Sequence, residues 1–84
     1  MNDNIGQIKT VRYFSMKDEI IFLVEESPEG GYEARALGFS IFTEANSISE
    51  LKVNVQEAVK CHFEENEYPL YIRLHFVKDE IIVL

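Results

Sequence analysis

The residues with the most obvious potential for chemistry are one cysteine and two histidines. Cys61 and His62 are neighbours in a segment of helical periodicity, so their side chains point about 100° apart and cannot form a nucleophile–base pair. We expect Cys61 to border the core, His62 to be packed or partly buried, and His75 to lie on the surface of a strand. A zinc site needs three or four ligands in a recognisable spacing, and these residues do not provide one. The sequence therefore predicts no metal site.

Paired carboxylates and a glycine pair are the other features that suggest catalysis. Glu25-Glu26 and Glu64-Glu65 lie at the expected ends of a strand and a helix, and adjacent carboxylates do not converge on one substrate atom. Gly30-Gly31 is followed neither by a helix start nor by a Lys-Ser/Thr pair, so it does not predict a phosphate loop. We expect no catalytic or cofactor-binding residues, no cofactor, and no enzyme activity. A small enzyme or an accessory enzyme subunit, with its site between helix and sheet, is the alternative.

The composition favours a small acidic domain. The 84 residues contain 8 Lys and Arg against 15 Asp and Glu, which gives a net charge of -7, and 46% are hydrophobic. Clustered cations, which phosphate contacts require, are missing, so we expect no direct binding of nucleic acid. No apolar run approaches the roughly 20 residues that span a bilayer, so we expect no membrane contact. The single cysteine and the absence of a signal-like N-terminus favour a cytoplasmic location.

The elements that must position these residues follow from apolar spacing. Residues 1–17 are expected to form an N-terminal arm or peripheral strand, and residues 18–84 a single domain that ends in a C-terminal hairpin. Ser47 and Glu50 form a capping box, which predicts a helix that ends before Pro69. Strands followed by one helix and further strands predict an α+β two-layer sandwich, an antiparallel sheet β-β-β-α-β(-β) with the helix on one face. The expected strands are Ile20–Glu25, Tyr32–Leu37, Phe39–Glu44, Leu70–Val77 and Glu80–Leu84.

Several short motifs occur in a familiar order over about residues 18–65. They are Glu25-Glu26, Gly30-Gly31-Tyr32, Ala36-Leu37-Gly38, Glu44, Ser47-x-x-Glu50-Leu51, Ala58 and Phe63. In this order they resemble the HicB-like antitoxin domain, and the chain is expected to be a small stand-alone member that lacks the C-terminal DNA-binding domain. The resemblance implies a partial double-stranded-RNA-binding-domain-like fold and self-association. In the antitoxins it also implies neutralisation of a small basic RNase.

Two surfaces are predicted to bind partners. The first expected strand is apolar on both sides, and one helix covers one face of a sheet, so an apolar patch is expected at an interface. This apolar patch predicts a homodimer or a higher even oligomer. The second surface is an acidic hairpin that would attract a small basic protein such as an RNase toxin. The interface candidates are Ile21, Leu23, Leu37 and Phe42, and the partner-binding candidates are Glu25, Glu26, Glu29 and Glu33.

These observations predict a small cytoplasmic, self-associating, protein-binding module that resembles the HicB antitoxins. A true antitoxin that neutralises a basic RNase is the alternative within the same resemblance.

Overall fold

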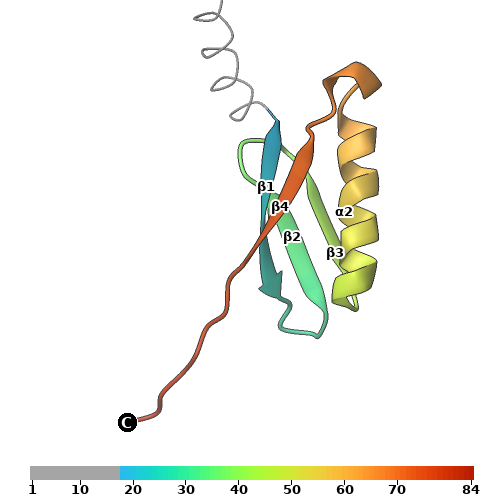
Figure 1. The fold of residues 1–84 in the computed structure, drawn as a ribbon. Coiled ribbons are helices and arrows are strands. Elements are labelled where there is room, and N and C mark those ends of the chain that lie inside the picture. The colour runs from blue at the N-terminus through green and yellow to red at the C-terminus, as the bar shows by residue number, and fades with distance from the viewer. Residues whose placement is uncertain (1–17) are drawn as a thin grey trace, which may run out of the picture.

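A four-stranded sheet and one helix form the fold of residues 18–84, the part of the chain that the computed structural model describes (Figure 1). The predicted α+β architecture, with the helix on one face of the sheet, is confirmed. The expected N-terminal arm or peripheral strand, residues 1–17, lies outside the described residues. The elements are β1 (Glu19–Glu26), β2 (Tyr32–Ala36), β3 (Phe42–Ala45), α2 (Ile48–His62), the 3-10 turn η1 (Glu65–Glu67) and β4 (Tyr71–Phe76).

The sheet is mixed, and the prediction of a purely antiparallel sheet is wrong. Its strand order is β3-β2-β1-β4, with β1–β2 and β2–β3 antiparallel and β1–β4 parallel. Two reversals make β3 run in the direction of β1. The chain then returns through α2, so β4 starts at the same end as β3 and runs alongside β1. The crossover helix, which lies along one side of the sheet in Figure 1, thus sets the direction of the last strand.

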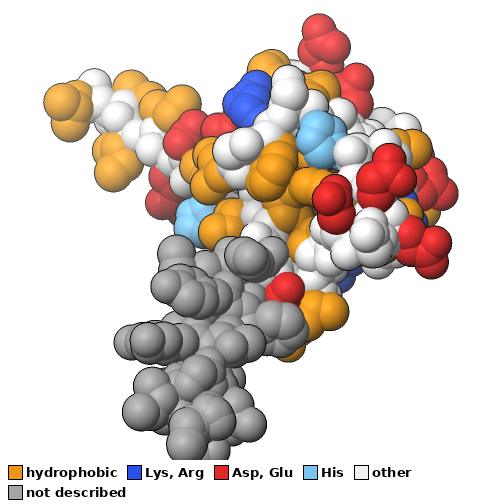
Figure 2. Space-filling view, turned by 90° about the horizontal axis from the view of Figure 1, so that it is seen from above, with side chains coloured by type: hydrophobic (Ala, Val, Ile, Leu, Met, Phe, Trp, Pro, Cys, Tyr) orange, Lys and Arg blue, Asp and Glu red, His pale blue; other side chains and the backbone are white. Residues whose placement is uncertain are grey.

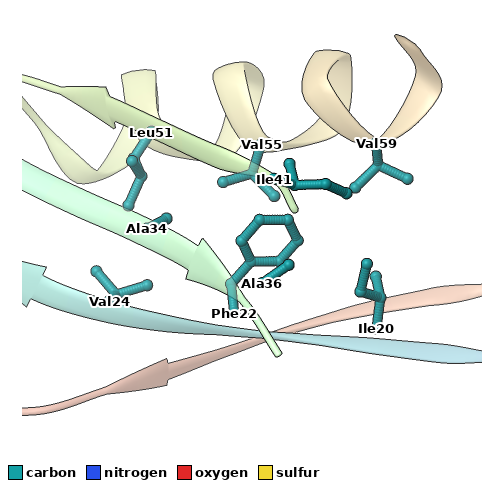
Figure 3. Packing of buried hydrophobic residues seen from close by; sticks show 9 residues of the cluster. All are labelled: Ile20, Phe22, Val24, Ala34, Ala36, Ile41, Leu51, Val55 and Val59. Carbon is teal, nitrogen blue, oxygen red and sulfur yellow. The ribbon is translucent and has the colours of Figure 1, made fainter. Parts of the chain in front are cut away.

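The core lies between α2 and the inward face of the sheet (Figure 3). Alternation along β1 directs every second side chain toward the helix. Ala34 and Ala36 on β2 are small, which allows the helix to approach this strand closely. The buried side chains are Ile20, Phe22, Val24, Ala34, Ala36, Ile41, Leu51, Val55 and Val59.

Local sequence signals determine the turn of the first hairpin and the start of the helix. Ser27–Gly31 forms the turn between β1 and β2, in which Gly30 and Gly31 have φ of 99° and 83°. The Ser47 hydroxyl accepts a hydrogen bond from the Glu50 amide at 3.2 Å. The Glu50 carboxylate accepts one from the Asn46 amide at 3.0 Å, so the capping pair forms as predicted, with its return bond one residue earlier.

The C-terminal segment, residues 77–84, forms no strand, and the expected hairpin is absent. The Val77 amide still donates to the Val24 carbonyl at 2.9 Å, after which the chain runs away from the sheet (Figure 1). A tight hairpin turn usually needs residues that accept positive φ, above all Gly or Asn. Lys78 and Asp79 stand at this point instead. An apolar pattern alone does not make a strand fold back.

Candidate functional site

The residues that suggested chemistry are scattered over the surface. Cys61 and His62 are both exposed, so the expectation that Cys61 borders the core is wrong, and His62 is packed against neighbouring rings without being partly buried. The His62 ring packs edge-on against Phe39 and Phe63, with centroids 5.8 and 4.9 Å apart. His75 is exposed on β4, as expected. Within residues 18–84, no group of three or more His, Cys, Asp and Glu side chains is arranged to hold a metal ion.

The four predicted interface residues lie together on the face of the sheet that α2 does not cover, which we call the open face. Ile21 and Leu23 alternate with the buried side chains of β1 and are half-buried, whereas Leu37 and Phe42 are 47% and 52% exposed. The register places Leu23 opposite Arg35, and Arg35 opposite Phe42. The Leu37 amide donates to the Ile21 carbonyl at 2.8 Å. The structure thus assembles an apolar band across three strands.

Arg35 lies in the middle of this band and adds a positive charge to it. Its guanidinium carbon lies 5.8 Å from the centroid of the Phe42 ring, within the range of a cation–π contact. The sequence did not reveal this neighbour, because it depends on the pairing of β2 with β3. Arg35 therefore presents a positive charge within an apolar surface.

A row of three carboxylates borders the apolar band. Glu25 lies opposite Glu33, and Glu33 lies opposite Glu44. Like charges in directly opposed positions destabilise a sheet. In the described part of the chain, the ion pair with a nitrogen–oxygen distance within 4 Å joins Arg73 and Glu19. No cation within residues 18–84 therefore pairs with the three carboxylates of the row at that distance. The three carboxylates form one concentrated negative surface.

The predicted acidic hairpin is divided between two hollows. Glu25, Glu26 and Glu33 line one of about 390 Å³, together with Lys78 and Asp79. Glu29 lines a different polar hollow of about 410 Å³, together with Glu44, Asn46 and Glu50. Glu44 was missed as a partner-binding candidate, although the alternation Phe42, Glu44 already placed it on the open face. The β2–β3 register is what brings it beside Glu33.

The charged residue at the other end of the open face is already paired. Arg73 donates from Nη2 and Nε to one oxygen of Glu19, at 2.7 and 3.0 Å. This hydrogen bond and the negative charge of Glu19 raise the pKa of Arg73. The pair joins the parallel strands β1 and β4, so it links the edge strand β4 to its neighbour in the sheet.

A groove runs between α2 and β4 on the helix side of the sheet. Its volume is about 320 Å³, and it is lined by Lys52, Val55, Gln56, Ile72, Leu74 and Phe76. Helix α2 lies mainly over β2 and β3, so Ile72 and Leu74 are only half-buried and Phe76 is 52% exposed. Lys52 and Gln56 supply the polar side chains of the groove. In the alternative of a small enzyme, this groove would be the site between helix and sheet. Its lining is apolar apart from one cation and one amide.

None of the helices in the described residues is long and apolar enough to cross a membrane. The open face and the groove both combine exposed apolar side chains with charged residues at their borders.

Comparison with known proteins places the chain in a family. A UPF0150 protein of Archaeoglobus fulgidus is 64% identical over 52 residues, which are 62% of this chain and 77% of that protein. A UPF0150 protein of Thermotoga maritima is 42% identical over 66 residues, which are 79% of this chain and 93% of that protein. No protein-family model matches the chain, and no solved structure does. The identity and coverage of these two relatives show that the chain belongs to the UPF0150 family.

Proposed function

We propose that this protein is a small cytoplasmic protein-binding module without catalytic activity, which associates with itself through the open face of its sheet. The observation that carries the proposal is the apolar band of Ile21, Leu23, Leu37 and Phe42. A band of half-buried and exposed apolar side chains of this kind is typical of an interface. A domain of this length also buries a smaller share of its surface than larger domains, so association adds stability that the core does not supply.

The oligomeric state tests this proposal. Light scattering of the full chain at tens of micromolar should give the mass of a dimer or a higher even oligomer. Phe42→Ser should weaken association, since burial of a large apolar side chain is worth about 1.5–3 kcal/mol. That range corresponds to a dissociation constant about ten- to a hundredfold higher.

Val53→Ser is the matched control, because Val53 is also 52% exposed but lies on α2. It should leave the mass unchanged. A monomeric wild-type protein would refute the proposal, and so would equal effects of the two substitutions.

A second candidate function is the capture of a small basic protein, as in the RNase-neutralising HicB antitoxins. The acidic row of Glu25, Glu33 and Glu44 favours it, because its charges lie side by side on a binding face. The resemblance of the motif order to the HicB-like domain, with its partial double-stranded-RNA-binding-domain-like fold, supports the same candidate. Electrostatic complementarity of this kind mainly raises the association rate.

Charge reversal tests this second candidate. Tagged protein is purified from its native cell, and a basic protein that co-purifies is identified and expressed. Glu25→Lys combined with Glu33→Lys should slow its association and weaken the dependence of the rate on salt. Glu57→Lys combined with Glu64→Lys makes the same change of charge at exposed positions, one within α2 and one beyond its end, and serves as the control. Equal rates for both double variants, or no basic protein at all, would refute this candidate.

A further inference from the structure

The C-terminal segment combines strong apolar character with full exposure. Its last four residues, Ile81, Ile82, Val83 and Leu84, are 85% exposed or more. The segment leaves the sheet at the end of β4 (Figure 1) and forms the arm at the upper left of Figure 2, in which hydrophobic side chains predominate. Exposure of four consecutive large apolar side chains to water is unfavourable in free energy. Burial of this segment against an apolar surface would therefore be favourable.

The groove between α2 and β4 is a surface of matching chemistry. Ile72, Leu74 and Phe76 line its floor, and Val55 lines the helix side. At the rim, Lys52 provides a positive charge, and Asp79 and Glu80 precede the apolar part of the segment. Groove and segment are therefore complementary in both apolar character and charge.

The backbone of β4 offers a second point of attachment. Within the described residues, β4 pairs with β1 alone and forms one edge of the sheet. An added strand could extend the sheet along this edge through main-chain hydrogen bonds. Because side chains alternate along a strand, one of the pairs Ile81/Val83 and Ile82/Leu84 would enter the groove, and the other would extend the open face. A segment that is apolar on both sides suits a position that is contacted on both sides.

The segment does not reach the groove of its own molecule by a tight turn. Val77 is held to β1 through the Val24 carbonyl, and Lys78-Asp79 lacks the Gly or Asn that a two-residue hairpin favours. A second copy can receive the same segment without a reversal. Exchange of an identical element between two copies is a low-cost route to a symmetric dimer.

We propose that residues 80–84 of each chain bind as an added strand along β4 and in the α2–β4 groove of a second copy. This inference rests on the proposed self-association and names a surface for it that is separate from the apolar band. Two different surfaces on one chain also allow assemblies larger than a dimer.

Disulfide trapping between different chains tests the exchange. Both proteins carry Cys61→Ser, which removes the native thiol. One carries Gln56→Cys in the groove, and the other carries Val83→Cys or, in a separate preparation, Ile82→Cys. Both positions are needed, since alternation directs one of them into the groove. After mixing and mild oxidation, mass spectrometry should find a disulfide between position 56 and position 82 or 83 of different chains.

Glu57→Cys replaces Gln56→Cys in the control, because Glu57 is exposed and lies about 100° further around the helix, away from the groove. Its yield of cross-linked product should be at least tenfold lower. Equal yields would reduce the result to random collision and overturn the exchange.

A chain that carries both cysteines tests the alternative within one molecule. A disulfide that forms in this double variant but never in the mixture would show that the segment folds back on its own groove, and it would overturn the proposal. No disulfide in either sample would also overturn it. If the wild-type mass is that of an oligomer in these cases, the proposed self-association stands without the exchange. A monomeric wild-type mass would refute both.

Discussion

Gly31 shows how one residue position is fixed by its neighbours. Its φ of 83° favours glycine, and a Cβ atom built on it would lie 2.6 Å from the Ala45 carbonyl oxygen, at the end of β3. Gly30 has a φ of 99°, but a Cβ atom there would have no heavy atom within 4 Å. Gly30 is therefore needed only for its backbone conformation. Gly31 is also needed because a side chain there would collide with Ala45.

This difference predicts unequal effects of the same substitution. Gly30→Ala should lower the free energy of unfolding by about 1–2 kcal/mol, because an L-residue is strained at this φ. Gly31→Ala should lower it by more, since the backbone of Ala45 must also move. Urea denaturation followed by circular dichroism measures both values. Similar losses for the two variants would contradict the close approach at Gly31.

Residue-scale signals were also the most predictable part of the fold. Ser47 and Glu50 correctly predict the start of α2, because capping depends on residues within one turn. The exposure of Cys61 and His62 was not predictable from their place in the helix. It depends on where α2 lies over the sheet, and the helix reaches the core through Leu51, Val55 and Val59.

At the scale of the elements, α2 is attached to the sheet by a narrow row of side chains. Leu51 has no exposed surface, whereas Val53, two residues later on the same helix, is 52% exposed. The core beneath the helix consists of the inward side chains of β1 and β2 together with Ile41 (Figure 3). Loss of volume at this row must therefore leave a cavity, while loss at the outer face does not.

Two truncations on the helix check this arrangement. Leu51→Ala should lower the free energy of unfolding by about 2–5 kcal/mol, the usual range for a buried leucine. Val53→Ala should change it by no more than about 0.5 kcal/mol, as is usual for surface positions. Both are measured by denaturant unfolding. A large loss at Val53 would contradict this arrangement, because it would show that the side chain is buried in the folded chain.

The direction of β4 was not predictable from the same kind of pattern. Alternation along residues 70–77 identifies a strand and its inward side, but it is the same for parallel and antiparallel pairing. The four interface candidates were predictable as a set, because alternation and a single helix define the open face. Their neighbour Arg35 and the acidic row required the strand register, which local sequence does not contain.

At the scale of the whole molecule, acidic groups dominate the charge. The net charge of -7 repels phosphate, and the open face carries Glu25, Glu33 and Glu44 side by side. Arg73, a cation of the same face, is already paired with Glu19. We therefore expect long-range attraction to favour a basic protein over a nucleic acid.

We expect no submicromolar binding of DNA or RNA by the full chain at about 0.15 M salt, where charges still act over roughly 8 Å. Fluorescence anisotropy with a labelled duplex and a labelled single strand measures this. Binding that weakens steeply with added salt would contradict the prediction, because it would reveal a cationic surface that contacts phosphates.

The parallel pairing of β1 with β4 has a consequence for the order of folding. The contact between Glu19 and Arg73 joins residues 54 positions apart, whereas β1 and β2 are linked by a short turn. Contacts between distant residues close long loops and form late. In a single chain β4 should therefore dock last and detach first. Its amide hydrogens should exchange with solvent faster than those of β1 paired with β2, and local opening should leave the remaining three strands and the helix intact.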